Sequence, residues 1–194
     1  MQELNVMPQL IASLLARPGV VVLVVLLVMA TVIDWRTYRI PNWLTVGGMV
    51  FGLIYNTVAA GPALSGLLLA LAGLGVGLVV LLPLYVLRVM GAGDVKLMAM
   101  VGAFMGVPDI VYAVLYALIA GGIAALGFAL YRRAFRRMTA NVADIVQAMA
   151  FAAMAGGRPT GHMPAQASIG KLPYGINICV GTIASLVVPQ LGFA

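Results

Sequence analysis

The run from Ile40 to Leu87 contains no charged residue, and it restricts the possible folds more than any other feature of the sequence. As a single helix, at about 1.5 Å per residue, this run would extend about 72 Å. The hydrocarbon core of a bilayer is only about 30 Å thick, so the run must reverse once. Gly61-Pro62 is the expected turn. The run therefore predicts one span near 43–60 and a second near 64–87.

The composition agrees with a chain that lies in lipid. Hydrophobic residues make up 63% of the sequence and charged residues 8%, against roughly a quarter charged in a soluble domain. We expect an all-α integral membrane protein of about six transmembrane helices, forming one polytopic domain over residues 1–194. The remaining spans are predicted near 18–34, 94–107, 110–131 and 172–193.

The positions of lysine and arginine predict the orientation in the membrane. With the N-terminus and the C-terminus outside, ten of the basic residues lie in cytoplasmic segments and only Arg17 lies outside. Segment 132–171 is then cytoplasmic and is predicted to form a surface helix and a loop. Its arginine cluster, 132–137, fits an anchor to lipid headgroups better than a docking site for substrate. The basic residues form no stripe with interleaved aromatics, so no nucleic-acid partner is expected.

Two carboxylates stand at the borders of predicted spans, where an ionisable group is costly and usually functional. The first span runs inward and ends at Asp34, and the fourth runs outward and begins at Asp94, which would be its N-cap. Both acids are therefore expected near the cytoplasmic interface, as a pair of carboxylates that hydrolyses a peptide bond requires. Gly91 and Gly93 leave room for a backbone beside Asp94. In a purely structural alternative, Asp94 is only a cap and Asp34 only marks the membrane border.

The fourth span is short for a helix that crosses a bilayer. From Asp94 to Val107 it would measure about 21 Å, against a core of about 30 Å. We expect either a locally thinner bilayer or an Asp94 that lies below the interface, within protein and water.

Three motifs resemble those of the type IV prepilin peptidase family of membrane aspartyl proteases. The segment 34–42, DWRTYRIPN, is similar to the family's first motif, and the segment 91–97, GAGDVKL, resembles its Gly-x-Gly-Asp motif. The segment 172–175, LPYG, resembles the Pro-Tyr-Gly element at the start of the family's last span. The resemblance implies that Asp34 and Asp94 are the catalytic pair. The other motif residues that we expect to bind substrate or shape the site are Pro41, Asn42, Gly91, Gly93, Lys96, Pro173, Tyr174 and Gly175.

By this resemblance the substrate is a prepilin or pseudopilin, whose basic leader is cut at the cytoplasmic face of the bacterial inner membrane. Larger relatives also methylate the new N-terminus and carry a domain with paired Cys-x-x-Cys zinc ligands. This chain has a single cysteine, Cys179, and looks like the short branch associated with tight-adherence (Flp-type) pili. We expect no methyl transfer, no metal and no cofactor. The competing function is a small transporter or proton relay that uses paired intramembrane carboxylates.

Overall fold

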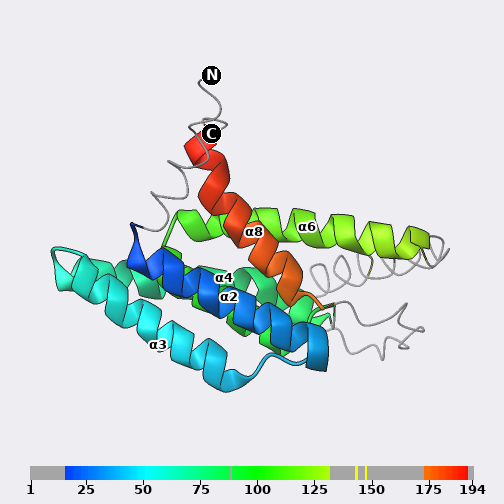
Figure 1. Ribbon diagram of the computed structural model, residues 1–194, viewed down its shortest axis with the longest axis horizontal. Coiled ribbons are helices and arrows are strands. Elements are labelled where there is room, and N and C mark those ends of the chain that lie inside the picture. The colour runs from blue at the N-terminus through cyan, green and yellow to red at the C-terminus, as the bar shows by residue number, and fades with distance from the viewer. Residues whose placement is uncertain (1–15, 88, 132–142, 144–146, 148–172, 192–194) are drawn as a thin grey trace. The chain divides into compact units, whose positions relative to one another are not determined.

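The computed structural model describes residues 16–87, 89–131, 143, 147 and 173–191, and within them the protein is helical (Figure 1). The elements of more than one turn in these residues are α2 (Pro18–Thr37), α3 (Asn42–Ala59), α4 (Ala63–Val86), α5 (Ala92–Met105), α6 (Asp109–Tyr131), α8 (Gly175–Val187) and the short 3-10 helix η2 (Val188–Leu191). The prediction of an all-helical protein is confirmed for these residues.

The chain divides into two compact units. The first comprises residues 1–121 and 173–194, and its described part holds α2 to α5, the first half of α6, and α8. The second comprises residues 122–172, of which the structure describes mainly the end of α6. The surface helix and loop predicted within 132–171 lie outside the described residues, apart from positions 143 and 147. The remaining description concerns the first unit.

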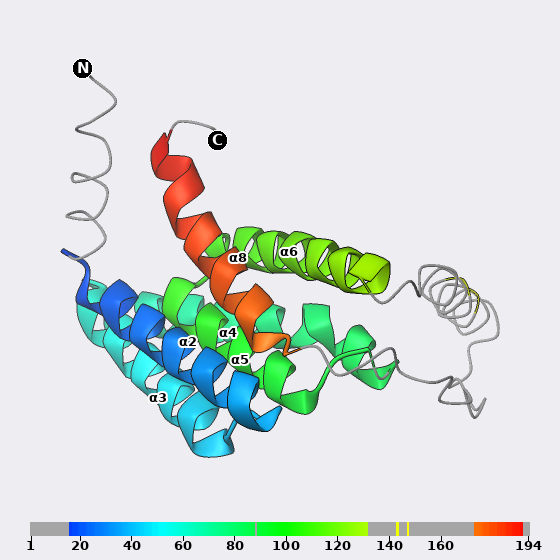
Figure 2. The same ribbon diagram turned by 45° about the vertical axis from the view of Figure 1, so that its right-hand side comes forward.

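Helix α5 lies at the centre of the first unit and packs against α2, α3, α4 and α8 (Figure 2). Most of its side chains are buried, including the unbroken run from Leu97 to Phe104. It has 14 residues, so the prediction of a short fourth helix is confirmed, although the helix begins and ends two residues earlier than predicted.

Glycine allows α4 and α5 to approach closely. Gly73 of α4 and Gly102 of α5 lie against each other's backbone, and Gly77 lies against the carbonyl group of Met98. Small residues at such a crossing let two backbones come into van der Waals contact, which is a main source of helix association in membranes.

A half-buried amide joins α3 to the end of α5. Nδ2 of Asn56 donates hydrogen bonds to the carbonyl oxygens of Ala103 at 2.8 Å and Phe104 at 3.0 Å. These carbonyls belong to the last turn of α5, where a helix offers them no partner of its own. Asn56 therefore fixes the C-terminal end of α5 to α3.

The outward faces of the helices are apolar, as expected of a protein in lipid. Large hydrophobic side chains are exposed on several helices, among them Val25, Val28 and Val32 of α2, Ile54 and Val58 of α3, and Leu64, Leu68 and Val79 of α4. Within the described residues, α2, α4 and α6 contain stretches long and apolar enough to cross a bilayer, and α8 is a shorter apolar helix. The full six-span topology stays a prediction.

Candidate active site

Asp34 lies in the last turn of α2 and is buried, with 5% of its surface exposed. It is the last member of a stripe of buried residues that also contains Leu23, Leu27 and Ala30. The helix does not end at Asp34, as the predicted span did, but continues to Thr37. Tyr38 then adopts the left-handed conformation, with φ of 52°, and its amide donates to the main-chain carbonyl of Asp34 at 2.8 Å. The acid is thus held inside a helical turn.

Asp94 lies in the first turn of α5 and is also buried. The prediction that it is the N-cap is wrong: the helix begins at Ala92, Gly91 is the N-cap, and Asp94 is the third helical residue. The main-chain amide of Gly91 donates to Oδ2 of Asp94 at 3.1 Å. In return the amide of Asp94 donates to the carbonyl oxygen of Gly91 at 3.2 Å. At this position the carboxylate accepts a hydrogen bond from a backbone amide that has no partner within the helix. This bond allows the helix to begin two residues before Asp94.

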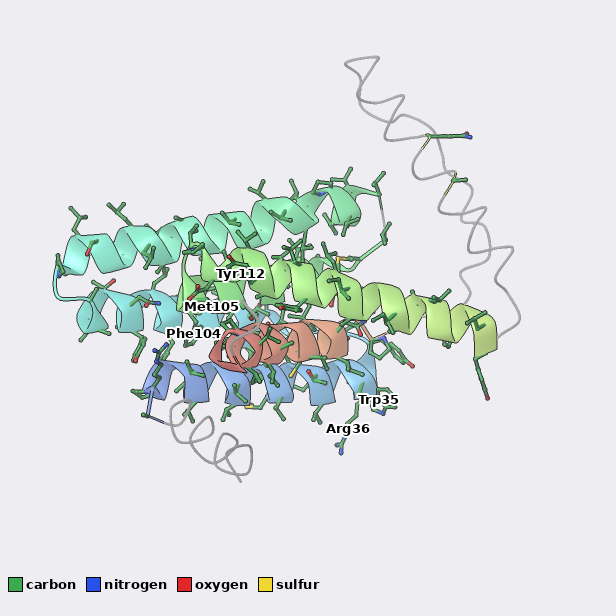
Figure 3. The ribbon with its side chains drawn as sticks, turned by 90° about the horizontal axis from the view of Figure 1, so that it is seen from above. Trp35, Arg36, Phe104, Met105 and Tyr112 are labelled. Atoms are coloured by element: carbon green, nitrogen blue, oxygen red, sulfur yellow. The ribbon has the colours of Figure 1, made fainter. Side chains whose placement is uncertain are left out.

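The two carboxyl groups come together from helices that run in opposite directions. Figure 3 shows Trp35 and Arg36, at the end of α2, well away from Phe104 and Met105, at the end of α5. The start of α5 lies by the end of α2, because Gly93 meets Ile40 in the loop that follows α2. Asp34 and Asp94 are near enough for their charges to interact. Of the three acids that the structure describes, these two are buried, whereas Asp109 is exposed.

The start of α8 forms a third side of the site. The amide of Gly175, the first residue of α8, donates to Oδ2 of Asp34 at 3.0 Å. Tyr174, the N-cap, packs against Gly121 of α6 and interacts electrostatically with Asp94. Pro173 precedes it and is half-buried. Residues far apart in the sequence therefore meet at the pair of acids.

The loop between α2 and α3 closes the same region. Pro41 is the N-cap of α3, and Oδ1 of the next residue, Asn42, accepts a hydrogen bond from Nζ of Lys96 at 2.9 Å. A Cβ atom placed on Gly93 would lie 3.1 Å from Cβ of Ile40. The space beside Gly93 is thus lined by this loop.

Two residues at the site carry no signal that the sequence analysis used. Thr31 donates from its hydroxyl group to the carbonyl oxygen of Gly175 at 3.3 Å, and Gly121 makes room for the ring of Tyr174. A threonine or glycine within an apolar helix is common, so only the packing of distant helices reveals these roles.

The arrangement can support acid and base catalysis. Two carboxyl groups at close range can share one proton, so that one activates water and the other polarises a carbonyl group. Among the described residues, no group of three or more His, Cys, Asp or Glu side chains gathers in a way that could hold a metal ion.

Comparison with known proteins supplies an independent finding. The family model described as the type IV leader peptidase family matches residues 21–126, which is more than half of the chain and includes both acids. No curated protein and no solved structure matches the chain.

Proposed function

This chain belongs to the type IV leader peptidase family and is an aspartic peptidase, and we propose that Asp34 and Asp94 are its catalytic carboxylates. Membership of the family implies that the reaction is cleavage of the leader peptide from a prepilin. The observation that carries the proposed pair is that two buried acids, from α2 and α5, lie close enough for their charges to interact.

In the proposed mechanism one carboxylate takes a proton from water while the other, protonated, donates to the carbonyl oxygen of the scissile bond. Water attacks the carbonyl carbon, and as the C–N bond breaks the first carboxyl group passes the proton that it took from water to the leaving amine. The second carboxyl group regains its proton from the hydroxyl group of the intermediate as the carbonyl re-forms. Amide donors at fixed positions, Gly175 for Asp34 and Gly91 for Asp94, support this assignment, because they orient each carboxyl group without supplying a competing charge.

The remaining motif residues are proposed to shape the site around the substrate. The Lys96–Asn42 hydrogen bond ties α5 to the start of α3, and Pro41 and Pro173 limit the loops that lead into α3 and α8. We propose that Tyr174, which interacts electrostatically with Asp94, lines the path of the substrate. We assign these residues to binding and positioning.

The proposed substrate is a prepilin or pseudopilin of the Flp type, cut beside its hydrophobic helix at the cytoplasmic face of the inner membrane. The excess of basic residues in the predicted cytoplasmic segments supports this face. The short α5 supports a cut near the membrane border, because at about 21 Å it does not span a core of about 30 Å. Transport through a proton relay would also explain buried acids, but the family match favours the peptidase.

The test is cleavage of a prepilin by membranes that contain single variants. Asp34→Asn and Asp94→Asn should each lower the rate by about 100-fold or more, because an amide cannot exchange the proton. Asp109→Asn is the matched control and should cleave normally, because its side chain is exposed and outside the site. Equal abundance of all variants in the membrane is the internal check. Normal cleavage by either of the first two variants removes that acid from the mechanism.

A further inference from the structure

The backbone of Gly175 is held by one face of α2 at both its N–H and its C=O, which belong to the two successive peptide groups joined at its Cα atom. Its amide donates to Oδ2 of Asp34 at 3.0 Å, and its carbonyl oxygen accepts from the hydroxyl group of Thr31 at 3.3 Å. Thr31 and Asp34 are three residues apart on a helix, so their side chains point to the same side. Two hydrogen bonds therefore attach the start of α8 to α2.

Either hydrogen bond alone would leave the start of α8 able to rotate, and the other bond prevents that rotation. The bond from Gly175 to Asp34 allows the start of α8 to rotate about the line that joins the two groups. A second bond, from Thr31 one turn away on α2 to the next peptide group, stops that rotation because both peptide groups meet at Cα of Gly175 in the first turn of α8. The direction from which the amide meets the carboxyl group of Asp34 is then fixed as well.

Gly175 lies so close to the Asp34 carboxyl group that a side chain at position 175 has no room. A Cβ atom on Gly175 would lie 3.0 Å from Oδ2 and 3.3 Å from Cβ of Asp34. Any side chain there would press on the carboxyl group. The carboxyl group and the start of α8 are therefore in contact, and a shift of α8 moves Asp34.

On the basis of the proposed function, we propose that Thr31 is a positioning residue of the peptidase, which sets the orientation of Asp34 through the backbone of Gly175. Thr31 does not reach the substrate. Catalytic groups must be held within a fraction of an ångström of their working geometry, and a small displacement lowers the rate of the chemical step more than it lowers binding.

The test measures kcat and KM for prepilin cleavage by purified full-length variants. Thr31→Val keeps the shape of the side chain and removes the donor, so kcat should fall by about 10- to 100-fold with little change in KM. Thr31→Ser keeps the hydroxyl group and should restore most of the lost rate. Unchanged kcat in Thr31→Val, or equal loss in Thr31→Ser, overturns the proposal. Failure of Thr31→Val to fold also overturns it, because a positioning role leaves folding intact.

A double-mutant cycle separates positioning through Gly175 from an independent structural role. Gly175→Ala should itself lower kcat, because its methyl group displaces the Asp34 carboxyl group. In the Gly175→Ala background, adding Thr31→Val should have less than about a threefold further effect, because the link is already broken. If the double variant loses kcat by the product of the two single losses, Thr31 acts by another route and the proposal is overturned.

Two control variants test whether the effect is specific to the hydroxyl group of Thr31. Thr57→Val removes a hydroxyl group that bonds only within α3, to the carbonyl oxygen of Leu53 at 2.7 Å. Cys179→Ala removes a thiol that is also within hydrogen-bonding reach of Thr31. Both should keep kcat within about twofold of the wild type, as expected away from a functional contact. A loss in Cys179→Ala that equals the loss in Thr31→Val would assign the effect to the thiol and overturn the link through Gly175.

Asp34→Asn, measured beside these variants, distinguishes this inference from the function on which it rests. An active Asp34→Asn variant refutes the proposed function, whatever Thr31 does. An inactive Asp34→Asn variant together with a fully active Thr31→Val variant refutes only the positioning role.

Discussion

At the scale of single residues, Gly93 lets the loop after α2 pack closely against the turn before Asp94, because glycine has no side chain. The sequence suggested that this glycine leaves room for the backbone of a substrate. The structure adds a neighbour within the protein, because a Cβ atom on Gly93 would lie 3.1 Å from Cβ of Ile40. Ile40 would have to move by a few tenths of an ångström even for alanine, and further for a branched side chain.

We expect Gly93→Val to lower the rate of prepilin cleavage by about 100-fold, because a displaced Asp94 is out of register with Asp34. Gly93→Ala should lose much less. Insertion and abundance should be unchanged in both, since the added atoms press on a loop and not on the helix core. Cleavage assays in membranes, with Gly47→Ala as the control whose added methyl group meets nothing within 4 Å, provide the measurement. Normal turnover by Gly93→Val would mean that the glycine only serves a turn.

Sequence reasoning at this scale can single out a residue that is chemically out of place. Asp34 and Asp94 could be picked out because acids are rare beside apolar spans. Thr31 could not, because its bond to Gly175 joins residues 144 positions apart in the chain. The position of Asp94 was placed three residues too early in its helix, because Gly91 gives no side-chain signal of an N-cap.

At the scale of helices, the crossing of α4 and α5 determines whether α5 can occupy the centre of the first unit. A methyl group on Gly73 would meet the carbonyl oxygen of Gly102 and lie 2.7 Å from Cα of Gly106. Those atoms belong to backbone and cannot move aside as a side chain can. By contrast, a methyl group on Gly75, two residues further along the same helix, meets nothing within 4 Å.

Gly73→Ala should therefore lower the free energy of unfolding in detergent by about 1–3 kcal/mol, the usual cost of overpacking. Gly75→Ala should leave the stability unchanged or raise it by up to about 1 kcal/mol, because alanine favours a helix more than glycine does. Thermal or denaturant unfolding of the two purified variants gives the comparison. Equal stability of the pair would mean that α4 and α5 do not cross at Gly73.

Helix existence was easier to predict than helix ends. The turn at Gly61-Pro62 and the reversal of the long uncharged run are confirmed by α3 and α4, which end and begin on either side of it. Helix α2 continues past Asp34 because the left-handed Tyr38, not the charged residue, ends it. Asn56 carries no signal in the sequence for its role, and only the packing of α3 on α5 shows that its amide bonds to the end of α5.

At the scale of the whole molecule, the prediction to test is the orientation in the membrane. With both termini outside, the turn between α3 and α4 lies outside, and segment 132–171 lies inside. Single cysteines at positions 61 and 162, in a Cys179→Ala background, would report each side. An impermeant thiol reagent added to intact cells should label Gly61→Cys and not His162→Cys.

Position 61 is a suitable probe because it is exposed and has free space around it. Permeabilised cells serve as the control, since both cysteines should then react. Labelling of His162→Cys in intact cells would invert the orientation and move the two acids to the opposite face of the membrane.

The enclosure of α5 has a consequence for how the enzyme tolerates different lipids. A change in bilayer thickness acts on helices that touch the acyl chains, such as α2 and α4, whose apolar faces are exposed. Helix α5 is surrounded by protein along most of its length. The depth of Asp94 in the membrane is therefore set by the packing of α5 against the neighbouring helices and not by contact with lipid. We therefore expect a substrate helix that packs against these neighbours to present its cleavage site at the same depth as the two acids in a thin bilayer and in a thick one.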